Sequence, residues 1–185
     1  MAIAKYEWIR SMKILFLIDG LLKGGKERQL FELLKGLKTK KKMIIELVVM
    51  NKEVEYKDVF NLEIRINFLI RKTKKDFSIF WQLVKIYKRF NPDIIHTFDT
   101  MTTFYVLPIK IFYNVKLING SIRFAASNIK KNIKLYYLYK FLFIYSDMIV
   151  ANSIAGLKTF NLNISSKNKY VYNGFDCTRI HNLEN

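Results

Sequence analysis

Short apolar runs alternate with longer amphipathic segments along most of the sequence. Residues 13–18 read KILFLI, residues 43–50 form a second, β-branched run, and a further strand is expected at residues 115–120. This pattern is typical of strands buried on both faces of a parallel sheet, because neither face meets water. Between these runs, residues 27–38 and 77–90 repeat apolar side chains at helical spacing. The alternation predicts βαβ units in an α/β fold: a Rossmann-like, mostly parallel sheet flanked by helices in a single domain.

The same reasoning assigns the remaining elements and the domain limits. Further strands are expected at residues 64–70, 93–97, 148–151 and 170–172, and further helices at residues 100–112, 131–145 and 154–160. Met12 reads as a second start of translation. We therefore expect residues 1–11 to form an N-terminal extension, residues 12–172 to form the domain, and residues 173–185 to begin a truncated interdomain linker.

The composition excludes several classes of protein. Hydrophobic residues make up 51% of the 185 residues, which is too many for a disordered chain. One cysteine and two histidines suffice neither for an internal disulfide framework nor for a Cys/His zinc cluster. No apolar run approaches the ~18 residues of a membrane-spanning helix. We expect a soluble or membrane-surface protein of a reducing compartment.

The net charge is strongly positive. The sequence holds 32 Lys and Arg residues against 15 Asp and Glu residues, a formal net charge of +17 at pH 7. Nucleic acid, anionic lipid and polyanionic substrates are natural partners of such a surface, and a solvated basic surface without a partner is an equally weighted alternative. The basic residues are scattered and form no known nucleic-acid-binding motif, so no specific nucleic-acid partner is expected.

Polar residues gather where the predicted strands end. The segments concerned are residues 19–25, 96–100, 120–123, 152–153 and 173–174. Ligands of open parallel sheets bind in the crevice at the carboxyl ends of the strands. We therefore expect the functional site to be built from these segments.

A glycine-rich loop follows the first strand and opens the first helix. Backbone at Gly24 and Gly25 could approach an anion, and the helix N-terminus offers free N–H groups to it. The spacing mimics a nucleotide phosphate loop, but Glu27 stands where that motif needs a hydroxyl, so an ATPase is not expected. A plain tight turn is the alternative.

Three side chains at the strand ends are candidates for binding or chemistry. His96 could donate to a sugar hydroxyl or a phosphate, or act as an acid or base, and Asp99 lies three residues further on. Arg123 could pair with an anionic group. A hydrogen-bonded structural histidine and a surface arginine are the alternatives. From the residues alone, the structural role is favoured for His96, and the two readings of Arg123 carry equal weight.

The predicted helix at residues 131–145 mixes lysines with tyrosines and phenylalanines. Basic groups beside exposed aromatic rings suit an anionic bilayer surface. A core helix with a solvated lysine edge is the alternative and is weighted slightly higher.

Four sequence segments, in order, carry a resemblance to a known family. They are KILFLIDG with GGKERQ at residues 13–29, PDIIHT at 92–97, SDMIVANS at 146–153 and YVYNGFD at 170–176. They resemble the first strand and GGAER helix start, the PDIIH strand, the ADxIVANS strand and the VIYNGID linker of GT-B-fold glycosyltransferases of the family 4 type. The resemblance covers nearly the whole chain and corresponds to the N-terminal, acceptor-side domain.

The resemblance implies a role for each matched residue. Gly24 and Gly25 would bind the diphosphate of a nucleotide-sugar donor, and His96 would be catalytic, facing the transferred sugar. The acceptor or substrate cleft would be lined by Asp99, Arg123, Ser153 and Asn173. Asp99 and Phe98 depart from the common pattern, in which many relatives carry a further histidine or other polar group.

The resemblance also implies an activity and its partners. We expect retaining hexosyl transfer from a nucleotide sugar, as co-substrate, to a glycan or lipid-linked acceptor, with no metal and no other cofactor. The family's donor domain, with its ExxxxxxxE motif, is missing from the sequence, so we expect a chain that is inactive alone. A truncated or split product, and one half of an enzyme whose donor domain is a separate chain, are the alternatives. The expected location is cytoplasmic, peripheral to the inner face of the cytoplasmic membrane. A non-catalytic, basic membrane- or partner-binding module is the alternative.

Overall fold

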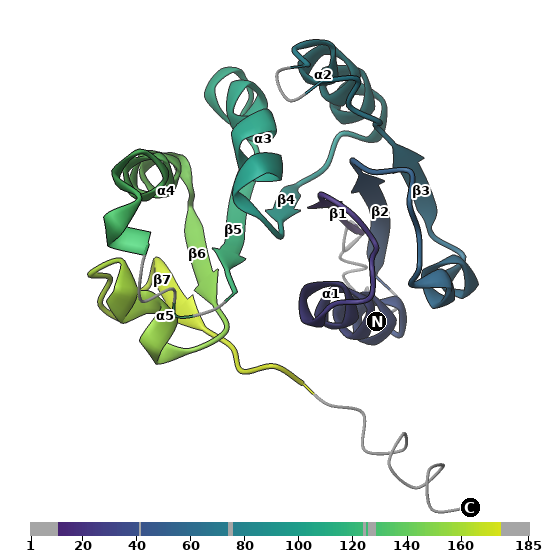
Figure 1. The fold of residues 1–185 in the computed structure, drawn as a ribbon. Helices are drawn as coiled ribbons and strands as arrows, with labels where there is room; N and C mark the ends of the chain where they lie inside the picture. Colours follow the sequence, from purple (N-terminus) through teal and green to yellow (C-terminus); the bar gives the residue numbers. More distant parts are fainter. Residues whose placement is uncertain (1–10, 41, 74–75, 124, 126–128, 175–185) are drawn as a thin grey trace, which may run out of the picture.

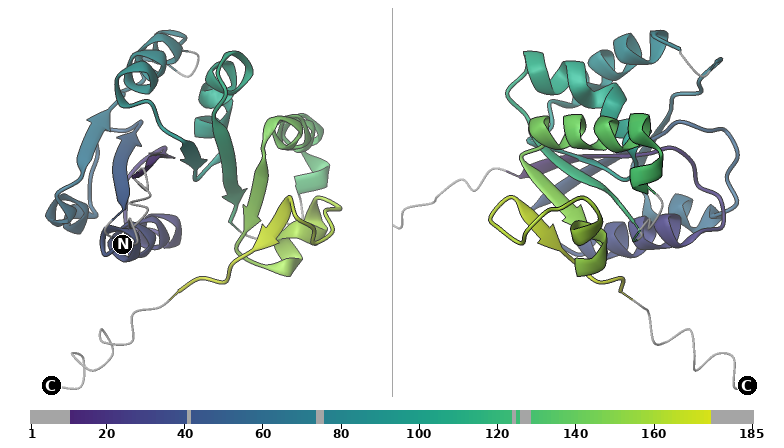
Figure 2. Two further views of the ribbon diagram at one scale, coloured as in Figure 1. Left: turned by 180° about the vertical axis from the view of Figure 1, so that it is seen from behind. Right: turned by 60° about the vertical axis from the view of Figure 1, so that its left-hand side comes forward.

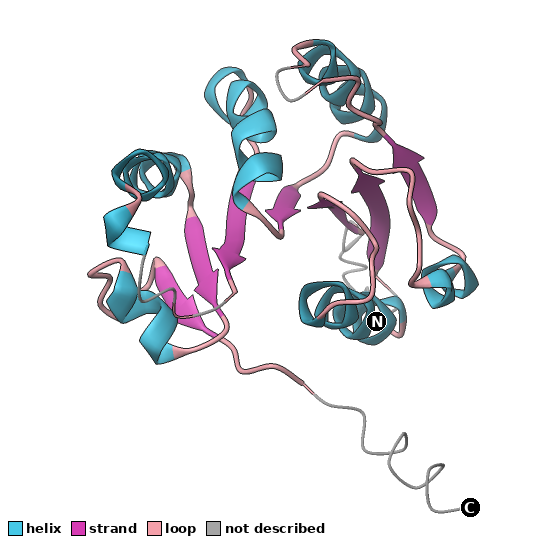
Figure 3. Ribbon diagram, viewed as in Figure 1, coloured by secondary structure: helices cyan, strands magenta, loops and turns pink. Residues whose placement is uncertain are grey.

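In the computed structural model, which describes residues 11–40, 42–73, 76–123, 125 and 129–174, seven parallel strands form one sheet (Figures 1 and 3). Their order across the sheet is β3-β2-β1-β4-β5-β6-β7, so the direction of winding reverses between β1 and β4. The strands are β1 (Met12–Ile18), β2 (Met43–Val49), β3 (Arg65–Phe68), β4 (Ile94–Thr97), β5 (Lys116–Ile122), β6 (Met148–Ala151) and β7 (Asn168–Tyr170).

Helices cover both faces of this sheet. Figures 1 and 2 show α2, α3 and α4 on one face and α1 and α5 on the other. The α-helices are α1 (Gly25–Lys38), α2 (Ser78–Phe90), α3 (Thr100–Phe112), α4 (Ile133–Tyr145) and α5 (Ile154–Thr159). Two 3-10 helices, η1 (Lys57–Leu62) and η2 (Ile129–Lys131), complete the described elements.

Strand β1 contributes to the hydrophobic core on each face of the sheet. Ile14, Phe16 and Ile18 belong to the cluster that packs against α1. Leu15 and Leu17 belong to the cluster that packs against α2 and α3. Successive side chains of a strand point to opposite faces, so a run without polar residues is what a central strand between two helical layers requires.

The predicted α/β architecture is confirmed, and each strand and helix expected from the sequence has a counterpart. The last strand was placed wrongly: it is Asn168–Tyr170 rather than residues 170–172. Its position is set by parallel pairing with β6, in which Ile149 faces Asn168 and Ala151 faces Tyr170. Polar residues on an edge strand carry no apolar signal, so the sequence pattern missed them.

Several other boundaries differ from the sequence prediction by a few residues, and two of them have a clear consequence or cause. Strand β5 continues through Gly120 to Ile122, so Arg123 follows the strand directly. Helix α4 begins at Ile133 rather than at residue 131, because Asn132 caps it by accepting a hydrogen bond from the N–H of Leu135 at 3.2 Å.

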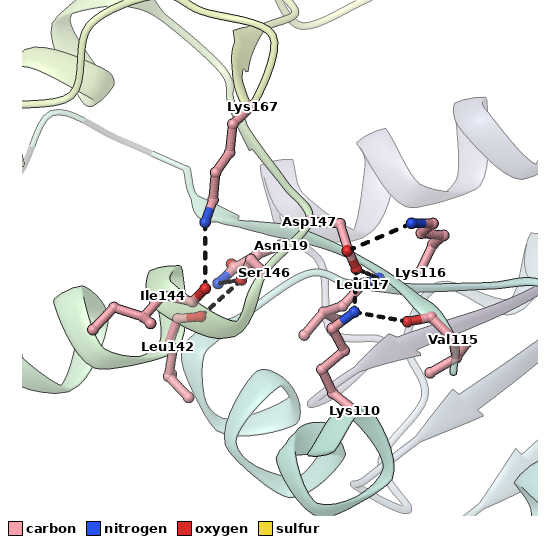
Figure 4. A network of polar contacts seen from close by, with 10 residues as sticks. All are labelled: Lys110, Val115, Lys116, Leu117, Asn119, Leu142, Ile144, Ser146, Asp147 and Lys167. Carbon is pink, nitrogen blue, oxygen red and sulfur yellow. Dashed lines mark hydrogen bonds and ion pairs between the residues drawn. The ribbon is translucent and has the colours of Figure 1, made fainter. Parts of the chain in front are cut away.

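A polar network fastens the amino ends of β5 and β6 (Figure 4). Asp147 accepts hydrogen bonds from the Leu117 N–H at 2.7 Å and from Lys110 Nζ at 2.6 Å. Nearby, Asn119 Nδ2 donates to Ser146 Oγ at 3.2 Å, and both side chains are buried. The network ties α3, β5 and the turn after α4 together at one edge of the sheet and leaves the opposite, carboxyl edge to the candidate site.

Candidate functional site

The carboxyl ends of β1 and β4 meet where the winding of the sheet reverses. The backbone N–H of Asp19 donates to Asp99 Oδ2 at 2.9 Å, and the backbone N–H of Thr102 donates to Asp99 Oδ1 at 2.8 Å. Asp99 therefore caps α3 and ties it to the loop after β1. In open parallel sheets a reversal of this kind is where ligands bind.

Asp19, Lys26 and Asp99 form a charged cluster at this reversal. Lys26 Nζ forms an ion pair with Asp19. Burial, and then the charge of Asp19, raises the pKa of Asp99 from 3.8 to about 6, against the opposing effect of Lys26. Both oxygens of Asp99 already accept backbone hydrogen bonds, so any acceptor contact would have to share them. The predicted acceptor role of Asp99 stays a prediction.

Gly24 and Gly25 lie at the start of α1, which begins two residues before the helix predicted at residues 27–38. Gly24 is the N-cap, and a Cβ on it would overlap a carboxylate oxygen of Glu27. Glu27 is buried and lies three residues into the helix, where an acidic side chain favours the helix N-terminus. A side chain at position 24 would therefore displace the Glu27 carboxylate from the start of the helix. A donor phosphate at this loop stays a prediction, and it would share the helix N-terminus with that carboxylate.

His96 extends from β4 on the same face of the sheet as α1. Its ring centroid lies 4.8 Å from that of Phe98 and 5.4 Å from that of Phe16. Burial, and then the positive charge of Arg123, lowers the pKa of His96 from 6.5 to about 3. The imidazole is therefore neutral at physiological pH, and its hydrogen bonds are those of a neutral donor and acceptor.

Arg123 folds back over the sheet from the end of β5. Its guanidinium carbon lies 4.1 Å from the centroid of the Phe98 ring, a cation–π arrangement. Burial lowers the pKa of Arg123 to about 10, although the charge of Asp99 acts in the opposite direction. A Cβ on Gly120 would lie 2.6 Å from Arg123 Nη2 and 3.0 Å from His96 Nε2. The missing side chain of Gly120 is what allows both groups to approach the sheet.

A pocket of about 430 Å³ opens beside these two side chains, and we call it the candidate pocket. It lies on the face of the sheet that α1 covers in part. Its lining comprises Gln29, Glu32, Leu33, His96, Phe98, Ile118, Arg123, Val150, Val171, Tyr172 and Gly174. Of the residues predicted from the sequence, His96 and Arg123 meet here.

The other predicted residues lie elsewhere. Ser153 caps α5 by accepting from the Gly156 N–H at 3.1 Å. Asn173 is exposed, although its neighbours Tyr172 and Gly174 line the candidate pocket. Among the described residues predicted for the site, Gly24, Gly25, Asp99, Ser153 and Asn173 do not line it.

Sequence reasoning missed several residues of the pocket. Gln29 and Glu32 lie on the polar side of α1, where helical periodicity predicts only solvent. Gly120 was expected only as part of the segment 120–123, although a glycine inside a strand often marks a close approach of other groups. Within the described ranges, no three His, Cys, Asp or Glu side chains are arranged to hold a metal ion.

Replacing Gly120 by alanine tests the crowding in the pocket. The new Cβ would also lie 3.0 Å from the backbone oxygen of Thr97, which cannot move freely within the sheet. We expect Gly120→Ala to lower the free energy of unfolding by about 1–3 kcal/mol in urea denaturation. Gly36→Ala is the matched control: Gly36 lies in α1 with no heavy atom within 4 Å of its Cβ position, and we expect a gain of about 0.5–1 kcal/mol. Equal stability of the two variants would contradict the geometry.

The depressed pKa of His96 predicts a pH dependence of stability. The unfolded chain takes up a proton near pH 6.5, whereas folded His96 does not until about pH 3, so the contribution of His96 falls as pH drops below 6.5. Between pH 7 and pH 5 the wild type should lose up to about 2 kcal/mol more than His96→Asn. The pKa of Asp99 shifts in the opposite direction. Because Asp99 is present in both proteins, its effect on stability cancels in the difference. Urea denaturation at each pH measures this difference, and parallel curves would show that His96 is not held neutral.

Comparison with known proteins assigns the chain to a family. Residues 23–179 match the family model described as Glycosyltransferase Family 4. A search of curated protein sequences gave no match.

Solved structures share the fold. HepE of Anabaena, crystallised with UDP and glucose, has 16% identity and a TM-score of 0.71 over 89% of this chain and 45% of its own. A glycosyltransferase of Rickettsia africae has 22% identity and a TM-score of 0.68 over 91% of this chain and 44% of its own. A UDP-N-acetylglucosamine 2-epimerase has 13% identity and a TM-score of 0.65 over 86% of this chain and 47% of its own.

This chain therefore spans about half the length of the structures that it matches. Identities this low establish the fold alone, and the fold is common to a transferase and an epimerase. The family model distinguishes between the two, since it covers most of the chain: the chain belongs to Glycosyltransferase Family 4.

Proposed function

We propose that this chain is the acceptor-side domain of a glycosyltransferase that transfers a hexose from a nucleotide sugar to a glycan or lipid-linked acceptor. The observation that carries the proposal is the match of residues 23–179 to Glycosyltransferase Family 4. No reported match supports the non-catalytic binding module considered as the alternative. Because the chain spans about half of the matched structures, the proposal includes a donor-binding half supplied by further polypeptide.

The donor in this proposal is a nucleoside diphosphate sugar. The support is that HepE has been crystallised with UDP and with UDP-glucose. In the proposed arrangement Gly24 and Gly25 approach the diphosphate and His96 faces the sugar. No metal or other cofactor takes part, an expectation that rests on the family resemblance.

Glycosyl transfer exchanges one bond at the anomeric carbon for another. The bond to the diphosphate oxygen breaks, the bond to the acceptor oxygen forms, and the acceptor proton passes to the leaving phosphate or to a base. A neutral His96 suits hydrogen bonding to a sugar hydroxyl and does not add a second cation to the site. Its part in the proposal is to orient the sugar.

Transfer in cell membranes tests the proposal. Membranes from cells with and without the gene are incubated with a panel of radiolabelled nucleotide sugars, and label is counted in extracted lipid and polysaccharide. We expect deletion of the gene to abolish incorporation from one nucleotide sugar. His96→Ala should restore at most about a tenth of it, the effect of one lost hydrogen bond.

The control is Lys169→Gln, an exposed change outside the candidate pocket, which should restore incorporation fully. A parallel assay with EDTA tests the expectation of metal independence. Unchanged incorporation from every nucleotide sugar after deletion would refute the proposed transferase activity.

We further propose a cytoplasmic location at the inner face of the cytoplasmic membrane, with α4 as the contact surface. Its solvent side carries Ile133, Tyr137, Phe141 and Ile144, which are 64%, 66%, 43% and 71% exposed. No helix in the described parts of the chain is long and apolar enough to cross a bilayer. An apolar helix face that lies open to solvent calls for a partner surface.

The charge around α4 supports an anionic bilayer as that partner. From Thr100 to Gly174 the sequence holds a single acidic residue, Asp147, which is already paired with Lys110. Basic residues in the same stretch include Lys130, Lys131 and Lys134 beside the start of α4. Lysines around an apolar stripe are the pattern of a helix that lies on anionic lipid.

Vesicle sedimentation tests this surface. We expect binding to vesicles with anionic phosphatidylglycerol and weaker binding to neutral phosphatidylcholine. Salt at 0.5 M should weaken the binding to anionic vesicles, because it screens an attraction of ~1 kcal/mol for each lysine near the surface. Tyr137→Ser with Ile144→Ser should reduce the partition coefficient at least about fivefold, because two exposed side chains no longer enter the interface. Ile164→Ser, at an apolar residue outside α4 that is 55% exposed, should leave the partition coefficient unchanged. Equal binding by both variants would assign the effect to charge alone.

A further inference from the structure

Three buried side-chain nitrogens in the candidate pocket lack hydrogen-bond partners among the described residues. They are Gln29 Nε2, His96 Nε2 and Arg123 Nε, and they come from α1, β4 and the end of β5. Buried polar groups in folded proteins are nearly always hydrogen-bonded, so each exception calls for an explanation. Three exceptions that line one pocket point to a common cause, a ligand that would satisfy them.

The charge of Arg123 is also unpaired. No carboxylate in the described ranges lies within ion-pair distance of its guanidinium. Asp99 acts on it from a greater distance, and its two oxygens accept the N–H groups of Asp19 and Thr102. A buried cation without a partner is unfavourable for folding, and its retention is explained if an anion completes the site.

The rest of the lining is mainly apolar. Leu33, Ile118, Val150 and Val171 contribute aliphatic side chains, and Tyr172 adds an aromatic ring. One charged side chain, Glu32, lies on the α1 side and disfavours an anion there. The ligand that fits is therefore amphiphilic, with its anionic group beside Arg123 and an apolar body along the sheet face.

We propose that the candidate pocket binds a phosphate group attached to an apolar chain, held by Arg123 with Gln29 and His96 as hydrogen-bonding partners. Guanidinium matches phosphate with two parallel hydrogen bonds, and the Arg123 guanidinium lies over the Phe98 ring. Within the proposed function, on which this assignment of substrate class rests, the ligand is a lipid-phosphate acceptor.

Thermal unfolding of the chain with four probes tests the pocket: farnesyl phosphate, farnesol, inorganic phosphate and UDP. A ligand that binds the folded state raises the Tm, and we expect farnesyl phosphate to raise it by at least about 2 °C at saturation. Farnesol lacks the anion and inorganic phosphate lacks the apolar chain, so each should give a smaller shift. UDP reports a donor site, and we expect its shift not to depend on Arg123.

Arg123→Met removes the charge and keeps the apolar stem. Without ligand we expect its Tm to equal or exceed that of the wild type, because an unpaired buried charge has been removed. Its shift with farnesyl phosphate should disappear, and Arg123→Lys should retain part of it with at least about tenfold weaker affinity. The matched control is Arg65→Met, at an exposed arginine of β3, which should leave the ligand shift intact.

The outcomes separate this proposal from its rivals. A lower Tm of Arg123→Met without ligand, together with an undiminished ligand shift, would show that the arginine is structural and overturn the proposal. A shift with UDP that requires Arg123 would assign the pocket to the donor and also overturn it. Because these are binding measurements, they stand whether or not the transfer assay detects activity.

Discussion

The pairing of β1 with β4 is the contact on which the rest of the molecule depends. These strands lie side by side although about 80 residues separate them, and an aspartate fastens each end of the pair. Asp93 accepts a hydrogen bond from the N–H of Lys13 at 2.8 Å, and Asp99 accepts one from the N–H of Asp19 at 2.9 Å. The reversal of the sheet, the start of α3 and the entrance to the site are all set by this one alignment.

The site built on that alignment is costly for folding. It buries a neutral histidine and a charged guanidinium over the same glycine, with Asp99 titrating nearby. A hydrophobic core of the same shape would be more stable, since buried polar groups without partners are unfavourable. Strain and unsatisfied polar groups of this kind concentrate at functional sites, where a ligand supplies the missing contacts.

Acidic residues are distributed unevenly along the chain, and the two halves of the domain differ in consequence. The first half contains the acidic residues that pair internally, including Asp19 with Lys26 and Glu46 with Arg89. The second half has Asp147 as its one acidic residue between Thr100 and Gly174. The positive net charge is shared by both halves: residues 1–99 hold 21 basic and 12 acidic residues, and residues 100–174 hold ten basic residues and one acidic residue, so each stretch carries +9. What distinguishes the α4 side is the near absence of acidic residues beside an exposed apolar helix face.

The sequence by itself determined the α/β class, the succession of strands and helices, and the family. The apolar run of β1, the helical periodicity of α1 and α2, and the glycine pair at Gly24 and Gly25 are local signals, and neighbouring residues suffice to produce them. The polar residues of the edge strand β7 were not predicted to form a strand, because pairing with β6 rather than their own composition defines that strand.

Tertiary structure alone decided how the site is assembled. The meeting of His96 with Arg123, the contribution of Gln29 from α1, and the commitment of Asp99 to backbone groups depend on side chains from distant strands and helices. Burial and neighbouring charges then set the pKa values of these groups. Both arise only when folding brings the strands and helices together. The order of residues names the candidates, and their packing fixes which of them line the candidate pocket.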